Sequence, residues 1–331
     1  MKKRLEVWVM VIVLLLFSAG LCQAAAKEVN LTWMAGSAGG GWYQMAAGIS
    51  AVVKDADPDI TIKVLPGGGT QNPPALAEKK VDIAFGLPFL IKAAIDGTTP
   101  YEKKYTELRL LACGYMSLNH LHLFAGEDTP FKTMDDVFGG KHKVRLATSQ
   151  QGASEVYILE RVLEVYNTSI EGLEKKGYHI ARGNYSFQVS QFKDQNVDVV
   201  WSFYAAPTAS VTEATIGRKL RLLHFSDKVR EHLKQYGIEP CEIPAGAYPQ
   251  AVNGNQAIRV SCNGSAILVH KDMPEEVAYR LAKAINENVD KVHKVHAGMA
   301  SYEPALGLQG SPGVIPHPGA VKYYKEKGWA K

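Results

Sequence analysis

The chain has 331 residues, of which 46% are hydrophobic and 21% are charged, and this usage excludes disordered and fibrous proteins. At about 100 to 200 residues per domain, the length predicts two domains, each large enough to bury its own core. The formal net charge of +4 is small and the basic residues are scattered, so nucleic acid is not expected as a partner.

The first 26 residues are typical of a secretory signal peptide. Lys2, Lys3 and Arg4 precede an apolar run over residues 7–17, and small residues follow at 24–26. The apolar stretch is about 15 residues long, whereas a membrane-spanning helix needs about 20, so cleavage is favoured over a retained anchor. Cys22 leaves lipidation open, although Leu21 in front of it disfavours this alternative. The mature protein is therefore expected in the periplasm.

The first part of the mature chain alternates predicted strands with glycine turns and helices. Strands are expected at 29–34, 60–65, 81–86 and 108–112. The turn at 35–41 opens a helix with apolar residues at helical spacing, and the turn at 66–70 leads to Asn72, a predicted N-cap before a helix that runs to about Lys80.

The second part repeats this order. Strands are expected at 120–124, 144–148, 178–181, 197–201 and 220–223, and the turn at 149–154 opens a helix. An extended run at 258–269 and a helix at about 274–295 follow. Strands that alternate with helices predict two similar α/β lobes with mainly parallel sheets.

The order of the elements also predicts the domain boundaries. After the signal peptide at 1–26, residues 27–117 and 262–331 are expected to form a discontinuous first lobe, and residues 118–261 the second. The crossing segments near 117–125 and 258–270 would act as the hinge.

The turns predict the chemistry of the site. In open parallel sheets, ligands bind beyond the carboxyl ends of the strands, where turns lead into helix N-termini. Free N–H groups and the partial positive charge of such termini suit a small anionic molecule. The turn at 36–41 is not a phosphate loop, because Trp42 occupies the Lys position, and Gln44 breaks a dinucleotide fingerprint. The chain contains no nucleophile-elbow or zinc-protease motif, so no catalytic residue is predicted.

Cysteine and histidine spacing favours neither a metal site nor a cofactor. Of the mature cysteines, Cys241 and Cys262 are nearest in sequence and form the best candidate for a disulfide bond, which the sequence leaves open. The pairs His120 with His122, and His293 with His296, could each share a face, but packing or surface histidines are the better interpretation.

Several of these segments are similar to the TAXI-type solute receptors of tripartite ATP-independent periplasmic (TRAP) transporters. The similarity rests on the glycine turn before Trp42 and Tyr43, the turn at 67–72, the segment 244–248 and, most specifically, residues 315–326. The resemblance implies a two-lobed periplasmic-binding-protein fold of the second type. It further implies a monomeric receptor that delivers a small carboxylate such as glutamate to a TRAP permease.

The resemblance and the turns together give a predicted ligand site. Its members are Ser37, Gly40, Gly41, Trp42, Tyr43, Thr70, Asn72, Ser149, Gln151, Gly152, Ser154 and Trp201. The expected mechanism is hinge closure around the solute, with polar turns on its carboxylate and an aromatic ring, Tyr43 or Trp201, over its carbon skeleton.

Two alternatives remain open at this stage. A secreted enzyme on the same fold, acting on a small anionic substrate, would need an acid or base pair in the cleft, and His120 with Glu155 is the best candidate. A surface interaction protein would instead have a cleft filled by aromatic side chains. The sequence names neither the solute, its stereochemistry, the coupling ion nor the permease.

Overall fold

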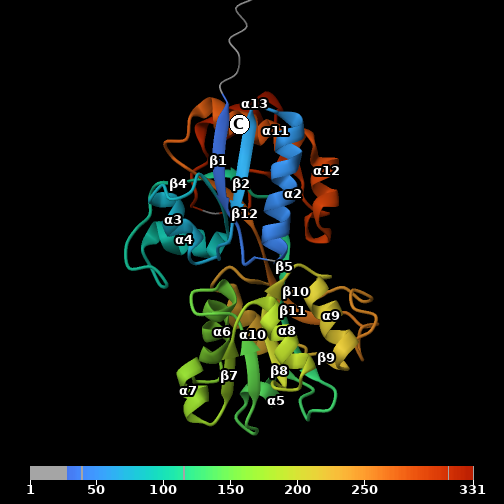
Figure 1. Ribbon diagram of the computed structural model, residues 1–331. Helices are drawn as coiled ribbons and strands as arrows, with labels where there is room; N and C mark the ends of the chain where they lie inside the picture. Colours follow the sequence, from blue (N-terminus) through green and yellow to red (C-terminus); the bar gives the residue numbers. More distant parts are fainter. Residues whose placement is uncertain (1–27, 39, 115, 312, 331) are drawn as a thin grey trace, which may run out of the picture.

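The computed structural model describes residues 28–38, 40–114, 116–311 and 313–330. The predicted signal peptide and Cys22 lie outside these residues. The described chain forms two α/β bodies, one above the other in Figure 1, joined by strands that cross between them. No helix within the described ranges is both long enough and apolar enough to cross a lipid bilayer.

The first lobe is built on a five-stranded sheet. Its strands, in spatial order, are β2 (Ile60–Leu65), β1 (Val29–Met34), β3 (Ile83–Gly86), β12 (Ala266–His270) and β4 (Leu108–Ala112). Its helices are α2 (Gly41–Ala56), α3 (Asn72–Ala77), α4 (Pro88–Asp96), α11 (Glu275–Glu287), α12 (Val289–Val295) and α13 (Pro318–Glu326), with short 3-10 turns η1 (Ala297–Met299) and η2 (Pro304–Leu306). Apolar side chains form one cluster on each face of the sheet, which accounts for the helices on both sides.

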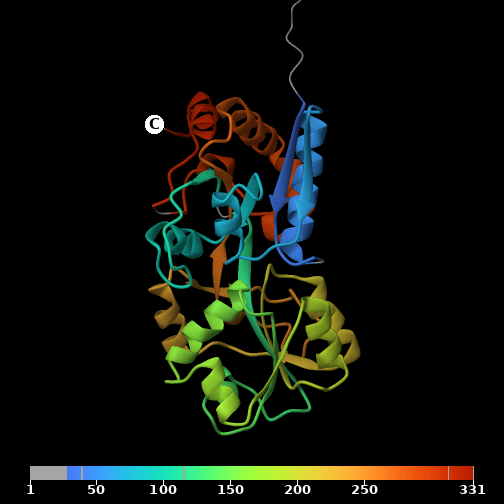
Figure 2. The same cartoon turned by 60° about the vertical axis from the view of Figure 1, so that its left-hand side comes forward.

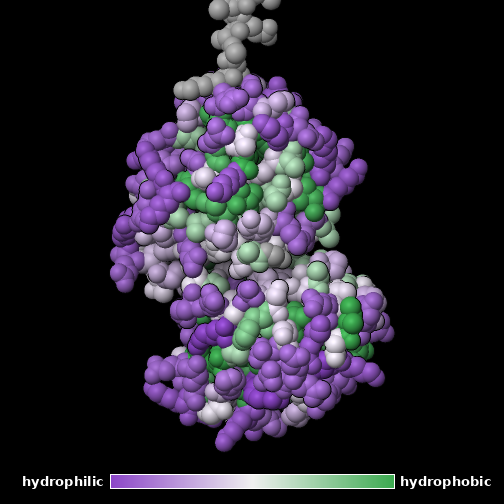
Figure 3. Space-filling model, in the orientation of Figure 1, coloured by the Kyte–Doolittle hydropathy of each residue, from purple (hydrophilic) through white to green (hydrophobic). Residues whose placement is uncertain are grey.

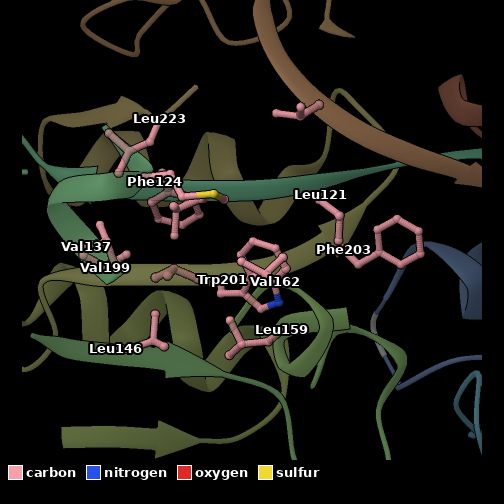
Figure 4. Close-up of a cluster of buried hydrophobic side chains, with 14 of the residues drawn as sticks. Leu121, Phe124, Val137, Leu146, Leu159, Val162, Val199, Trp201, Phe203 and Leu223 are labelled. Carbon is pink, nitrogen blue, oxygen red and sulfur yellow. The ribbon is translucent and has the colours of Figure 1, made fainter. Parts of the chain in front are cut away.

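The second lobe contains a seven-stranded sheet. Its strands, in spatial order, are β10 (Glu239–Ile243), β11 (Ile258–Gly264), β5 (Leu118–Gly126), β8 (Val199–Tyr204), β6 (Arg145–Thr148) and β7 (His179–Arg182), while β9 (Leu220–Leu222) pairs with β5 off this path. Its helices are α5 (Met134–Phe138), α6 (Ser154–Glu164), α7 (Ile170–Lys175), α8 (Tyr185–Lys193), α9 (Ala209–Gly217) and α10 (Asp227–Lys234). Trp201 lies in the core of this lobe, where Figure 4 draws it with Leu159 and Val162 of α6.

The sheets are mixed rather than mainly parallel as expected. Strands β1, β2 and β3 pair in parallel, as do β6, β7 and β8. Of the crossing strands, β5 is antiparallel to both β8 and β11 in the second sheet, and β12 is antiparallel to β3 and β4 in the first. The physical reason is that crossing segments enter a sheet from the other lobe and not through a helix of the same lobe.

The crossing segments lie side by side at the junction of the lobes, where β5 pairs with β11; Figure 2 shows the green strand β5 crossing between the lobes near the orange part of the chain. The predicted extended run at 258–269 is divided by Ser265, so that β11 belongs to the second sheet and β12 to the first. Ser117 and Ser265 meet there, with 2.7 Å between their hydroxyl oxygens, and the Ser265 N–H donates to the Ser117 carbonyl.

The internal repeat is visible in two equivalent aspartates. The Asp82 carboxylate accepts from the N–H and the hydroxyl of Thr32 on β1, both at 2.8 Å. The Asp198 carboxylate accepts from the N–H of Arg145 on β6 at 3.1 Å and from its guanidinium. Each aspartate thus joins the strand that it precedes, β3 or β8, to the neighbouring parallel strand, β1 or β6, which is a structural role.

The disulfide left open by the sequence is present in the structure. Cys241 on β10 and Cys262 on β11 are bonded, with 5.9 Å between their Cα atoms. Because Cys262 also lies opposite His120 of β5, the bridge is next to the strand that crosses between the lobes.

Candidate functional site

A cavity lies at the junction of the two lobes, at the waist that is visible in Figure 3. It leaves about 170 Å³ for water-sized molecules. One water needs roughly 10 to 15 Å³ on this measure, so the space suits a small organic molecule. The first lobe contributes Gly36, Ser37, Gly40, Gly41, Trp42, Gly67, Gly68, Gly69, Gln71 and His296; the second contributes Asn119, Thr208 and residues 149–155, 183–185 and 203–205.

The N-termini of five helices in the described part of the chain border this cavity. The first residues or N-cap residues of α2, α3, α6, α8 and α9 all line it, and the first turn of α3 contains Pro73 and Pro74, which have no N–H to donate. Asn184 caps α8 with its side chain, but no side chain caps α2, α6 or α9. Away from the cavity, Thr133 and Ser169 cap α5 and α7, whereas α4, α10 and α11 have no side-chain cap. The first-turn N–H groups of three helices are therefore left without a side-chain acceptor where they border the cavity, and they favour an anionic group.

The two lobes contact each other beside the cavity. The Thr70 hydroxyl donates to the Gly152 carbonyl across the gap. A Cβ atom at Gly69 would lie 2.9 Å from the Cβ of Ser154, and one at Gly40 would lie 3.1 Å from the Tyr185 ring. A side chain at Gly69 would force a shift and one at Gly40 would be tight, so the first-lobe turns approach the second lobe closely and the structure corresponds to a closed cleft.

The wall contributed by the second lobe contains a hydrogen-bonded carboxylate. Glu155 is 4% exposed, and it accepts from the Ser149 hydroxyl and, at 3.2 Å, from the Ser154 hydroxyl. Gln188 donates to the Ser149 oxygen at 3.1 Å and so orients it. The Glu155 side chain is held in place by neutral donors.

Aromatic rings complete the wall. Tyr185 and Tyr204 meet edge to face, with 4.6 Å between ring centroids. Trp42 packs on Phe85 at 5.3 Å, and its buried Nε1 has no hydrogen-bond partner among the described residues. An unsatisfied buried N–H is costly, so it is a candidate donor to a bound solute.

His296 is the histidine that lines the cavity. Its Nδ1 accepts from the N–H of Gly298 at 3.0 Å, and burial lowers the pKa of the ring, so it is neutral at pH 7. None of the lining residues in the described part of the chain is Lys or Arg.

Most of the predicted site residues line this cavity. They are Ser37, Gly40, Gly41, Trp42, Ser149, Gln151, Gly152 and Ser154. Thr70 lies beside it and joins the lobes through Gly152.

Besides Thr70, three predicted residues do not line the cavity. Tyr43 follows Trp42 on α2 and is outside the lining. Asn72 is fully buried behind the turn, where its amide donates to the Ala35 and Phe85 carbonyls at 2.8 Å. Trp201 is in the core, and its Nε1 donates to the Glu155 carbonyl at 2.7 Å. Side chains alternate between the two faces of β8, so Trp201 and Phe203 lie on the same face. Phe203 is nearer the end of the strand and lines the cavity, whereas Trp201 stays in the core.

The structure adds residues that the sequence did not assign to the site. Asn184 and Tyr185 follow β7 and open α8, which is the same strand–turn–helix pattern as at the other turns. That pattern could have identified them. Asn119, Thr208 and His296 come from the crossing strand, from the N-cap of α9 and from the end of α12, and no local pattern indicates them.

The histidine pairs have other roles. His122 is buried, and its ring lies 2.9 Å from the Tyr248 hydroxyl, while His293 lies 2.8 Å from the Tyr302 carbonyl. Within the described residues, no group of three His, Cys, Asp or Glu side chains is arranged to hold a metal ion. Of the acid or base pair considered above, Glu155 lines the cavity and His120 does not.

A comparison with known protein families identifies the family of this chain. Residues 34–328 match the model of the NMT1-like family. The chain belongs to the NMT1-like family. The narrower similarity to TAXI receptors stays a prediction for this NMT1-like protein.

Solved structures establish the fold of this NMT1-like protein. MatC from Rhodopseudomonas palustris with bound malate has a TM-score of 0.53 at 11% identity, over 92% of this chain and 98% of that one. The periplasmic binding protein BugD has a TM-score of 0.52 at 14% identity, over 93% and 99% of the two chains. A periplasmic transporter gives 0.51 at 13%, over 92% and 94%. The two-lobed fold of type II periplasmic binding proteins is thus shown.

Proposed function

We propose that this protein is an extracytoplasmic receptor that closes its two lobes around a small solute with a carboxylate group. It then delivers the solute to a membrane permease of the TRAP class. The solute shifts the equilibrium from the open to the closed form. It binds the closed form more tightly, because only there does it contact both lobes.

One observation carries the proposal. Helix N-termini without side-chain caps border one cavity from both lobes, α2 from the first and α6 and α9 from the second. Each helix end has a partial positive charge and free N–H donors, so a carboxylate that bridges them favours closure. The fold is consistent with this function, and MatC, which shares it, has malate bound.

The permease class and the carboxylate are the finer parts of the proposal. They are supported by the similarity of residues 36–43, 67–72 and 315–326 to TAXI receptors. A position outside the cytoplasmic membrane is supported by the predicted signal peptide.

The proposal is tested by thermal shift and calorimetry of the purified protein with a panel of small amino acids and carboxylic acids. At least one solute is expected to raise the melting temperature. Ser37→Ala and Ser154→Ala should weaken its binding about 3- to 10-fold each, which is the effect of one lost hydrogen bond. Ser190→Ala is the matched control, since Ser190 bonds to Asp194 on α8 and does not line the cavity.

Native mass spectrometry of the exported protein adds an independent measurement, because it detects a metabolite that has been retained from the cell. The receptor function is wrong if no solute is retained and none in the panel changes the melting temperature.

A further inference from the structure

A buried tyrosine holds the N-terminal end of α9 from behind the cavity wall. Tyr248 is 1% exposed, and its hydroxyl oxygen accepts from the N–H of Thr208, the N-cap residue of α9, at 3.1 Å. Thr208 lines the cavity, whereas Tyr248 does not. Within the described residues no side chain caps α9, so its first-turn N–H groups keep no side-chain acceptor. Tyr248 thus fixes the helix end without occupying these donors.

A histidine orients the hydroxyl of Tyr248. The Nε2 atom of His122 lies 2.9 Å from the Tyr248 oxygen, and its Nδ1 atom lies 2.8 Å from the carbonyl oxygen of His120. A carbonyl only accepts, so Nδ1 carries the proton, and in a neutral ring Nε2 then accepts from the Tyr248 hydroxyl. Burial lowers the pKa of His122 to about 3, which keeps the ring neutral at pH 7. The three hydrogen bonds therefore run in one direction, from the N–H at the cavity to a backbone carbonyl of β5.

The loop that carries Tyr248 is attached to the same sheet as His122. This loop joins β10 to β11, and the Asn253 side chain within it bonds to both the N–H and the carbonyl of Leu222 on β9, at 3.1 and 2.9 Å. Strand β9 pairs with β5, the strand that carries His122. The tyrosine therefore has a defined position relative to the strand that crosses between the lobes.

The segment that Tyr248 holds also contacts the first lobe. Ala205 and Thr208 both line the cavity, and Ala205 is part of the apolar cluster of the first lobe. A Cβ atom at Gly298 would lie 2.5 Å from the Cβ of Ala205, so the two lobes approach closely at this point. A shift of residues 205–208 would therefore change both the donors that border the cavity and the contact between the closed lobes.

We infer that Tyr248 is a positioning residue of the receptor. Its hydroxyl, oriented by His122, holds the N-cap of α9 where the first turn of this helix can donate to the solute. The inference rests on the proposed receptor function and adds a residue that acts on the solute through Thr208. Without the hydroxyl, the Thr208 N–H loses its acceptor and residues 205–208 become more mobile.

NMR of the full-length mature protein tests this role without a solute. Tyr248→Phe keeps the ring and removes the hydroxyl, so the Thr208 amide should exchange with deuterium at least about tenfold faster. In the wild-type protein the ring ¹⁵N signals of His122 should show a proton on Nδ1, and the Nε2 signal should shift in Tyr248→Phe. Tyr178→Phe is the matched control and should change neither signal. Tyr178 is also buried in the second lobe and donates to the Val137 carbonyl at 2.7 Å, but it does not line the cavity.

Affinity measures the consequence for the solute. Glutamate and malate are the probes, and calorimetry with stopped-flow kinetics is the measurement. Tyr248→Phe should bind the probe that the wild-type protein binds roughly 3- to 10-fold more weakly, mainly through faster dissociation. Tyr178→Phe should bind it like the wild-type protein. His122→Gln keeps an acceptor oxygen for the tyrosine hydroxyl, so it should retain more affinity than His122→Leu.

The outcomes separate this inference from the receptor function. If a probe binds and Tyr248→Phe binds it as tightly as the wild-type protein does, the positioning role is wrong and the receptor function is supported. The positioning role is also wrong if exchange at Thr208 is unchanged in Tyr248→Phe, or rises equally in Tyr178→Phe. If the wild-type protein binds neither probe, the exchange comparison alone decides whether Tyr248 holds the end of α9.

Discussion

At the scale of the residue, Asn72 shows how a polar side chain beside a site can act through the backbone. Its amide donates to the carbonyls of Ala35 and Phe85, and its oxygen accepts from the N–H of Gly68 at 2.9 Å. It thus joins the first two glycine turns to the end of β3. The turn that lines the cavity depends on this residue for its position.

Substitution of this residue should cost stability. In Asn72→Ala, four backbone groups lose a partner, two of them in buried hydrogen bonds, so the free energy of unfolding should fall by about 2 to 5 kcal/mol. Urea unfolding followed by circular dichroism measures the change. Asn196→Ala, at an exposed position, is the control and should change it by less than about 0.5 kcal/mol. An equal midpoint for Asn72→Ala and the wild-type protein would show that the network is not stabilising.

The sequence was sufficient to locate the glycine turns but not to separate lining residues from supporting ones. Asn72 and Ser154 both follow a turn and both are polar, yet one is behind the turn and the other lines the cavity. Which way a side chain points depends on the distances between the turns, and those distances are set by packing. For the same reason the carboxylate of Glu155 was considered only as part of a catalytic pair.

At the scale of the element, the turn before α3 meets the start of α6 at Gly69. The site of a Cβ atom there is 2.9 Å from the Ser154 Cβ and 3.2 Å from Leu90, whereas at Gly68 the nearest neighbour is at 3.9 Å. Two adjacent glycines therefore differ in whether they tolerate a methyl group. The closer one is at the contact between the lobes.

This difference predicts effects of different size for the same substitution at the two positions. Gly69→Ala should weaken binding of the identified solute roughly 5- to 100-fold, because the overlap occurs in the closed form and costs about 1 to 3 kcal/mol. Gly68→Ala also places a methyl group at the cavity wall but without the overlap, since its nearest neighbour is 3.9 Å away, so it should weaken binding less than Gly69→Ala does. Calorimetry gives the affinities, and small-angle scattering tests whether Gly69→Ala stays more extended with solute present. Equal affinity in the two variants would show that this contact does not limit closure.

Strand positions were predicted well because their apolar runs are local signals, and β1, β2 and β4 have the expected bounds. The direction of the crossing strands is not a local property. Residues 258–269 were expected as one extended run, and the run does not show that its two halves pair in different sheets on either side of Ser265.

At the scale of the whole molecule, histidines buried in the neutral form are distributed over both lobes. Burial lowers the pKa of His120, His122, His224, His270, His296 and His317, to about 4 for His120 and about 3 for His122. In the unfolded chain a histidine has a pKa of about 6.5. The unfolded state therefore binds more protons between these values, and stability should fall as the pH decreases below about 6.5.

The expected loss is measurable by urea unfolding between pH 7.5 and pH 5.5. His120 and His122 together should lower the free energy of unfolding by about 2 to 3 kcal/mol at pH 5.5. His120→Gln removes one of the two groups and should flatten the dependence. A free energy of unfolding that is constant over this range would contradict the assignment of these rings as neutral and buried.

The position of β12 between β3 and β4 determines the order in which a growing chain can complete its two halves. Residues 83–112 supply the neighbours of a strand that begins only at residue 266. All strands of the second sheet have emerged by residue 264, so the half that is started first is finished last. Until then, β3 and β4 each expose an unpaired edge. A nascent or translocating chain therefore needs protection against intermolecular strand pairing mainly in its N-terminal third.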